Sequence, residues 1–368
     1  MSISKIIVTG DFLRPNNEGN SSQNININWF YYATRHALSR ATSLPVERYL
    51  FSLSAESLTS KLYRWHRLGM SIDSWANLYF REPDERDIGA MWAHFHGALV
   101  VGFELPYFVK KAFSLAGIIF IDVVVHPVRF MDDLIFGFQS NSAQVLRDSS
   151  EYTVYEEDIY SQAGLVQAAM SRLPRKSGFR FGAGLFAGQT DDDKVLIRNG
   201  KFIDPFGERK SIAVSLSGYP QVLIKPHPYG KIHKSILLIS RTMINAKIVE
   251  DNFYFLLSHD EVEDVVSFCS STSIEARYFG KNGKMIFDYP YNFLFGGENI
   301  EDHIKSDPFL SVYVSLNAPF YNADFWRKIL KSIMPVTGIN GRGGFIKPNR
   351  FRISLRSFWG FDFVEKVC

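Results

Sequence analysis

The chain has 368 residues, of which 46% are hydrophobic and 21% charged, and this composition excludes a disordered or fibrous protein. Its formal net charge of +3 lacks the large basic excess of a dedicated nucleic-acid binder, so no nucleic-acid partner is expected. The length predicts two domains. The 2 cysteines, Cys269 and Cys368, exclude a disulfide framework and favour a reducing cytosol. No apolar run approaches the roughly 18 residues of a membrane span, and no signal peptide is expected.

The first half of the chain predicts a parallel sheet. Residues 5–9, 98–103 and 118–125 are apolar and rich in β-branched side chains, which favours buried strands. Residues 29–41 and 54–68 have the pattern of helices. Continuous apolar strands that alternate with helices are typical of a parallel sheet covered on both faces.

The second half repeats this style and predicts a second doubly wound domain. We expect domains at 1–170 and 171–337 that face a cleft, with ligands at the carboxyl ends of their strands. A third segment, 338–368, interleaves basic and aromatic residues. It is either a basic edge strand with a closing helix or a surface for anionic lipid or glycan. The further predicted elements are strands at 208–216, 221–225, 234–238, 264–268 and 284–287 and helices at 165–173 and 273–278.

The strand predicted at 221–225 ends at Lys225, His227 comes two residues later, and each of the two precedes a proline. Proline restricts the backbone, so both side chains are expected to be fixed at the carboxyl edge of a sheet. A cation beside an imidazole donor suits a phosphate. The alternative is that His227 has only a structural role.

Serine residues follow the next predicted strand and open a helix. Ser270, Ser271 and Ser273 supply hydroxyl groups and a helix cap, and the first-turn N–H groups favour an anion. Glu275 lies where it could accept hydrogen bonds from two ribose hydroxyls. The alternative interpretation is an ordinary capped helix.

An acidic turn supplies the candidate catalytic carboxylates. Gln189 follows a short apolar segment, and Asp192 and Asp193 come shortly after it. A carboxylate beside a sugar can act as a nucleophile or stabilise a cation. The alternative is a solvated acidic turn.

Together these motifs, Gly-Gln-x-x-Asp-Asp, Lys-Pro-His-Pro and Ser-Ser-x-Ser-x-Glu-Ala, resemble those of the bacterial β-Kdo transferases of capsule and lipopolysaccharide synthesis. The chain is also more distantly similar to bacterial sialyl- and polysialyltransferases. The resemblance covers about 184–287.

The resemblance implies a two-domain GT-B glycosyltransferase that takes a CMP-activated acidic sugar, acts in the cytoplasm and needs no metal or other cofactor. It implies that Lys225 and His227 contact the CMP phosphate, that Ser270 and Ser271 support it and that Glu275 lies near the ribose. It implies Asp193 as the catalytic carboxylate of a retaining reaction. The expected reaction moves Kdo from CMP-Kdo to a saccharide or glycolipid acceptor, with peripheral contact at the inner face of the inner membrane. Three alternatives stay open: a sialyltransferase-like enzyme for another CMP-sugar, a non-catalytic scaffold of glycan assembly, and a phosphotransferase-like enzyme of cell-wall polymer synthesis that would use a CDP-linked donor.

The first half should supply the acceptor side. Glu104 follows a predicted buried strand, where a carboxylate can take a proton from a hydroxyl; the alternative is a carboxylate near a helix start. His126 and Arg129 follow another strand and could bind an acceptor or the sugar's carboxylate, or form a structural network. His94 and His96 have no cysteine or third histidine close in sequence, so no metal site is predicted.

Overall fold

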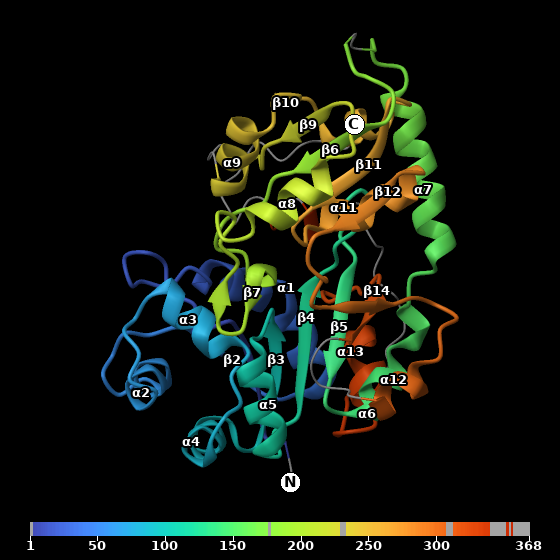
Figure 1. Ribbon diagram of the computed structural model, residues 1–368. Coiled ribbons are helices and arrows are strands. Elements are labelled where there is room, and N and C mark those ends of the chain that lie inside the picture. The colour runs from blue at the N-terminus through green and yellow to red at the C-terminus, as the bar shows by residue number, and fades with distance from the viewer. Residues whose placement is uncertain are drawn as a thin grey trace. The chain divides into compact units, whose positions relative to one another are not determined.

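The computed structural model describes residues 3–175, 178–228, 233–306, 312–338, 351, 352 and 355, which form two compact units (Figure 1). The first unit contains the described residues up to 126, residues 133–155 and those from 291 onward. The second contains residues 127–132 and 156–290. Each unit has its own β-sheet with helices, which confirms the predicted α/β class with two Rossmann-like units.

A seven-stranded sheet organises the first unit, in the order β13-β14-β5-β4-β3-β1-β2. β5 pairs antiparallel with β4 and β14, and the other neighbours pair in parallel. The apolar runs predicted as strands are therefore its inner strands. The strands are β1 (Lys5–Gly10), β2 (Val46–Arg48), β3 (Ala98–Phe103), β4 (Phe120–Val125), β5 (Phe136–Ser140), β13 (Asn292–Leu294) and β14 (Val312–Leu316).

Helices cover both faces of this sheet. Alternate strand residues such as Ile6 and Val8 join one core with Trp29 of α1 and Trp326 of α13. The intervening residues face α4 and α5. Burying each large apolar side chain of the core stabilises the unit by about 1.5–3 kcal/mol. The helices are α1 (Asn24–Thr42), α2 (Leu58–Trp65), α3 (Ile72–Tyr79), α4 (Glu85–Phe95), α5 (Tyr107–Leu115), α6 (Ala143–Asp148), η1 (Ser150–Tyr152), α12 (Ile300–Ser306) and α13 (Ala323–Leu330).

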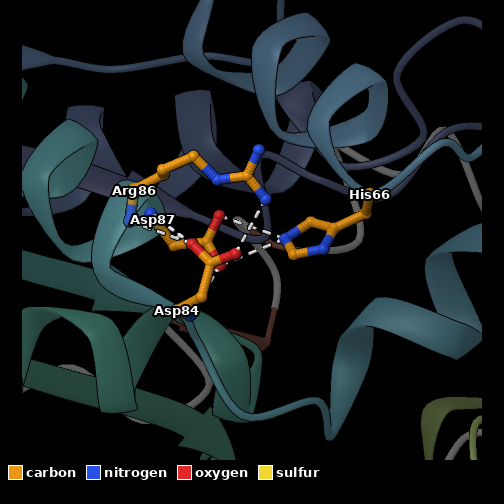
Figure 2. Close-up of polar contacts among 4 residues, drawn as sticks. All are labelled: His66, Asp84, Arg86 and Asp87. Atoms are coloured by element: carbon orange, nitrogen blue, oxygen red, sulfur yellow. Dashed lines mark hydrogen bonds and ion pairs between the residues drawn. The ribbon is translucent and has the colours of Figure 1, made fainter.

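A capping box begins α4 and ties it to the residue that follows α2 (Figure 2). The Asp84 carboxylate accepts the N–H groups of Arg86 and Asp87 at 2.9 and 3.1 Å, and the Asp87 carboxylate accepts the Asp84 N–H at 2.8 Å. The fully buried Asp87 also lies 3.0 Å from His66 Nε2. The hydrogen bond from Arg86 lowers the pKa of Asp84 to about 2, so the cap is ionised at neutral pH.

Five parallel strands form the sheet of the second unit, in the order β10-β9-β6-β11-β12. A short antiparallel hairpin of β7 (Ile197–Arg198) and β8 (Lys201–Phe202) follows β6 in the chain. The sheet strands are β6 (Ala183–Ala187), β9 (Val222–Lys225), β10 (Ala246–Ile248), β11 (Val262–Ser267) and β12 (Asn282–Met285). The helices are α7 (Glu156–Met170), η2 (Lys194–Leu196), α8 (Arg209–Leu216), α9 (Lys234–Thr242), α10 (Phe253–Leu257), α11 (Ser271–Ala276) and η3 (Arg277–Phe279).

Two segments predicted as strands are helices. Residues 208–216 contain α8, and residues 234–238 belong to α9. Their buried side chains lie three or four residues apart, Ile212 with Leu216 and Ile236 with Ile239, which is the period of a helix. Short apolar runs satisfy the strand and helix patterns alike, and this ambiguity caused the error.

Residues 291–337 were expected in a domain that spans 171–337, but the structure groups them with the first unit. β14 pairs antiparallel with β5, and α13 joins the core of the first sheet. The local sequence pattern contains no sign of such distant pairing. Residues 156–170, expected in the first domain, belong to the second unit as α7.

Most of segment 338–368 lies outside the described residues, and so does its predicted contact with lipid or glycan. Within it, Phe351 is buried against Trp29, Phe136 and Phe320 of the first core, and its N–H donates to the Asp133 carboxylate at 3.1 Å. Across the described ranges, no helix has the length and hydropathy to cross a bilayer.

Candidate functional site

The strand order of the second sheet defines where a ligand is expected. The chain leaves the central strand β6 toward β9 and β10, and then returns to β6's other side with β11 and β12. In sheets of this order, ligands bind beyond the carboxyl ends of the two strands at which the order reverses. Those strands are β6 and β11, so residues 188–193 and 268–273 carry the candidate site.

Asp193 is fixed by two hydrogen bonds at the start of η2. Its Oδ1 accepts the Val195 N–H at 3.2 Å, and its Oδ2 accepts Gln189 Nε2 at 3.3 Å. Gln189 is the second residue after the end of β6 and is 5% exposed. Its Oε1 is buried and has no hydrogen-bond partner among the residues that the structure describes. The amide thus orients a half-buried carboxylate and keeps one acceptor available, while the neighbouring Asp192 is exposed.

Cys269 joins the same cluster from the end of β11. Its Sγ donates to Val195 O at 3.1 Å, and the side chain is fully buried. Burial is the main cause that raises the pKa of this thiol to about 12, with the Arg198 guanidinium opposing the rise and the Asp193 carboxylate adding to it. Cys269 therefore stays protonated at neutral pH, which excludes it as a thiolate nucleophile.

The end of β9 lies beside the end of β6. The Gly188 N–H donates to Lys225 O at 2.8 Å, and a Cβ at Gly188 would lie 3.2 Å from His227 N and 2.9 Å from Ile236 Cδ1. A side chain at Gly188 would therefore fit only if the Ile236 side chain and the backbone of β9 shifted. The structure therefore brings the backbones of two sequence motifs together, and the side chains of Lys225 and His227 are both partly exposed.

Sequence reasoning missed a second histidine at this edge. The His233 ring lies 6.3 Å from that of His227, and its Nδ1 is 3.8 Å from Asp191 Oδ2. Its Nε2 is buried without a hydrogen-bond partner among the described groups. Recognising residues 234–242 as a helix would have identified His233 as its N-cap at the carboxyl edge of the sheet.

The serine motif divides into exposed and buried members. Ser270 caps α11 by accepting the Thr272 N–H at 3.4 Å, and Ser271, partly exposed, begins this six-residue helix. Ser273 is buried, and its Oγ lies 2.8 Å from Ser267 Oγ and donates to the carbonyl groups of neighbouring strands. The nucleotide contacts expected of these serines stay predictions, and the structure gives Ser273 a packing role as well.

Glu275 is buried within the second unit. Its Oε1 accepts the Arg129 N–H at 2.6 Å and the Tyr254 hydroxyl at 3.1 Å. These bonds attach residues 127–132 to α10 and α11. Its expected contact with a ribose, and the expected substrate contact of Arg129, stay predictions.

The corresponding edge of the first sheet lies between β1 and β3, because the strand order β4-β3-β1-β2 reverses there. Glu104 follows β3, is partly exposed and has a φ of 58°. A residue other than glycine in this left-handed region costs about 1–2 kcal/mol. Asp11 follows β1, but its buried carboxylate accepts Trp75 Nε1 at 2.8 Å and the Leu13 N–H at 3.1 Å, which fixes the loop.

A buried polar cluster next to Glu104 was also missed. Lys110 on α5 and Asp122 on β4 are 1% and 0% exposed, and both contact the Tyr313 hydroxyl of β14. Two adjacent lysines within the otherwise apolar helix 107–115, of which Lys110 is the buried one, and a single aspartate within the apolar strand 120–125 were the available signals. Lys and Asp are almost never fully buried unless they are paired.

His126 is fully buried in the first unit, where its Nε2 lies 3.2 Å from Ser315 Oγ and its ring packs against Phe293. Its predicted contact with an acceptor stays a prediction. Within the described ranges, no group of three His, Cys, Asp or Glu side chains could hold a metal ion. His94 and His96 lie beside backbone carbonyls of their own helix, at 2.9 and 3.0 Å.

No model of a protein family matches the chain, and no curated protein matches it. The chain is similar to the solved β-Kdo 2,7-transferase of KpsC from Thermosulfurimonas dismutans, with 12% identity and a TM-score of 0.32, over 63% of this chain and 74% of that one. It is also similar to the β-Kdo 2,4-transferase of the same KpsC, with 17% identity and a TM-score of 0.31, over 50% and 68%. At these TM-scores, the likeness identifies neither a reaction nor a site in this chain.

Proposed function

We propose that the chain is a glycosyltransferase that moves Kdo from CMP-Kdo to a saccharide acceptor of a bacterial surface polysaccharide. One observation carries the proposal. At the carboxyl edge of the second sheet, Gln189 holds the Asp193 carboxylate at 3.3 Å, and the preceding Gly188 packs against the backbone of Lys225 and His227. A carboxylate on one loop of this edge, with a cation and an imidazole on the neighbouring loop, suits the cleavage of a sugar–phosphate bond.

In the first step, the Asp193 carboxylate attacks the anomeric carbon of the donor as its bond to the phosphate oxygen of CMP breaks. The carbon passes through a state that resembles an oxocarbenium ion, and a glycosyl ester forms on Asp193. The CMP phosphate leaves with the electron pair of the broken bond. Lys225 and His227 stabilise this charge, and Ser270 and Ser271 supply hydroxyl donors. The Oε1 of Gln189 is available to a donor hydroxyl.

In the second step, the acceptor hydroxyl attacks the same carbon, and the ester bond to Asp193 breaks. Two displacements at one centre retain the anomeric configuration. The hydroxyl proton goes to a general base, and we assign this role to Glu104. A carboxylate fixed in a strained conformation at the ligand-binding edge of a sheet fits such a role.

The proposal includes no metal and no other cofactor, because side chains of the chain supply every charge that the two steps need. It locates the reaction at the cytoplasmic face of the inner membrane, where glycolipid acceptors are available. A sialyltransferase-like enzyme would use the same side chains with a different donor, so the donor is an outcome of the test.

The test is a product assay with purified chain, CMP-Kdo and defined saccharide acceptors. The expected result is CMP release that depends on the acceptor, with a product whose anomeric configuration, measured by NMR, matches that of the donor. CMP-sialic acid and UDP-sugars serve as controls. Turnover of another CMP-sugar alone would correct the donor, an inverted product would exclude the adduct, and failure to bind any nucleotide would exclude the transferase.

Donor binding gives a second, independent measurement. We expect His227→Ala to weaken CMP binding by about 10- to 100-fold in calorimetry, because a charge-assisted hydrogen bond to phosphate contributes about 1.5–3 kcal/mol. His94→Ala, at an exposed position on α4, is the matched control and should leave CMP binding unchanged. Equal affinity of the two variants would remove His227 from the phosphate site.

A further inference from the structure

Glu104 differs from the other strained residues of the chain. Four described residues other than glycine have a positive φ, and Ser43, Arg67 and Asn199 lie after helices or in the β7–β8 turn. Such places commonly accept a left-handed residue. Glu104 instead directly follows a central strand of the sheet, β3. Strain at such a place persists only when the surroundings hold it.

Two hydrogen bonds from backbone N–H groups to β4, one to a carbonyl oxygen and one to a carboxylate, hold the turn at this residue. The Glu104 N–H donates to Val123 O at 2.9 Å, and the next N–H, that of Leu105, donates to Asp122 Oδ1 at 2.9 Å. The Leu105 side chain folds back over Gly102, where a Cβ would lie only 2.4 Å from it. The Asp122 carboxylate therefore fixes the turn at Glu104 by accepting one of its N–H groups.

Asp122 is itself fixed from its other oxygen. Its Oδ2 accepts the Tyr313 hydroxyl at 2.8 Å and lies 3.7 Å from Lys110 Nζ. The ammonium group of Lys110 donates to Tyr313 at 2.8 Å and to Gln139 Oε1 at 2.7 Å, and Gln139 Nε2 donates to Val312 O at 2.9 Å. The cluster thus joins α5, β4, β5 and β14 beneath one turn.

This arrangement is costly if its only purpose is stability. Removing two charges from water carries a penalty that a well-packed apolar pair of the same volume avoids. The cluster also interacts electrostatically with Glu104. Burial first, then the charge of Asp122 and, to a smaller extent, that of Glu104 raise the pKa of Tyr313 well above its usual value. The strain at the neighbouring Glu104 is explained if the cluster serves to keep the Glu104 carboxylate rigid and oriented.

We propose that the Lys110–Asp122–Tyr313 cluster is a positioning device that fixes the turn at Glu104 and so directs its carboxylate at the acceptor hydroxyl. The inference rests on the proposed function, in which Glu104 is the general base. Lys110, Asp122 and Tyr313 touch no substrate and act through the turn.

Two matched double variants test the device. Lys110→Met/Asp122→Leu removes both charges and the acceptor for the Leu105 N–H. Lys110→Met/Asp122→Asn also removes the charges but keeps an amide oxygen for that N–H. The leucine variant should lower kcat by about 30- to 100-fold with an unchanged KM for the donor, since misplacement by about 1 Å costs that much. The asparagine variant should restore most of kcat, and Lys111→Met, the next residue on α5, should match the wild type.

A mutant cycle with Glu104→Gln separates positioning from general destabilisation. In that background, the leucine variant should cause no further loss, because residues that act as a unit are not additive. Losses that multiply, or a change confined to the donor KM, would overturn the proposal. If the leucine variant does not fold, Tyr313→Phe replaces it, with an expected loss of about 3- to 10-fold that is absent in the Glu104→Gln background.

Crystal structures make the result independent of the assay. The leucine variant, or Tyr313→Phe in its place, should release Glu104 from the left-handed region, whereas Lys111→Met should keep it there. If the wild type transfers no sugar, the proposed function fails, and the conformation of Glu104 in the variants still decides the positioning role. Retention of the wild-type turn in both cluster variants would overturn it.

Discussion

The first sheet holds Glu104 at its carboxyl edge through a buried ion pair, whereas the second sheet holds Asp193 through the neutral amide of Gln189 and one backbone N–H. Both residues follow a strand at the point where the strand order reverses. A fixed ion pair resists displacement, which suits a base that must keep one direction. Neutral donors leave the carboxylate reactive, which suits a nucleophile.

Replacing the carboxylate of the second edge should have the largest effect. Asp193→Asn keeps an oxygen for the Val195 N–H and removes the nucleophile, so kcat should fall by about 10³-fold or more. CMP affinity, measured by calorimetry, should change by less than about twofold, because the binding side chains remain.

Asp158→Asn, at an exposed position near the start of α7, is the control for loss of one negative charge from the same unit. It should transfer sugar at the wild-type rate. Turnover by Asp193→Asn equal to this control would show that Asp193 is not the nucleophile. The proposed difference in role between Asp193 and Glu104 would then be lost.

Breaking the Lys110–Asp122 ion pair of the first sheet should have the next largest effect, which is a loss of stability. Lys110→Met leaves Asp122 charged and buried without its cation, and such a change typically costs about 3–5 kcal/mol. Urea unfolding measures it, with Lys111→Met expected within about 0.5 kcal/mol of the wild type. Equal stability of the two variants would mean that the pair is not charged, and the contrast between the two edges would disappear.

The sequence indicated residues at the carboxyl edges of both sheets, but not the buried cluster beneath Glu104, for a physical reason. Lys225 ends a predicted apolar strand, and Gln189 and Ser270 each come two residues after an apolar run, so the local pattern places them at a sheet edge. The first cluster joins Lys110, Asp122 and Tyr313, which only the folded sheet brings together. No local periodicity reports a contact across such distances in the chain.

Helix boundaries limited the prediction in a similar way. Interpreting residues 234–238 as a strand concealed His233, whose position beside His227 depends on the start of α9. Grouping residues 291–337 with the second domain concealed Tyr313, since β14 pairs with β5. Both errors concern elements whose short apolar runs are decided by tertiary packing.

The Cys269 thiol, at the carboxyl edge of the second sheet, should have a smaller effect, which appears in the pH dependence of stability. Burial first, with Arg198 opposing and Asp193 adding, raises the pKa of Cys269 from 9.0 to about 12. The folded chain therefore keeps a proton that the unfolded chain releases above pH 9, so stability should fall with rising pH, by roughly 1 kcal/mol per unit. Urea unfolding from pH 8 to 11 in a Cys368→Ser background measures this slope.

Cys269→Ala in the same background should flatten the slope, because the variant has no thiol to titrate. An equally steep slope in both proteins would mean that other groups cause it. Fast labelling of native Cys269 by a thiol reagent at pH 8 would contradict its burial.

Relieving the backbone strain at Glu104 should give the smallest change in stability. It also separates strain that serves the reaction from strain that does not. Glycine avoids a left-handed cost of about 1–2 kcal/mol but loses about 0.5–1 kcal/mol in chain entropy, so Glu104→Gly should stabilise the chain by about 0.5–1 kcal/mol. Asn199→Gly relieves a φ of 50° in the β7–β8 turn and should gain less, because asparagine accepts the left-handed region more readily than glutamate. Only the first variant should lose transfer, by about 10²-fold, since it removes the base. A gain in stability together with a loss of activity in Glu104→Gly would identify strain that is kept for function. If both variants kept full activity, Glu104 would have no role beyond forming the turn.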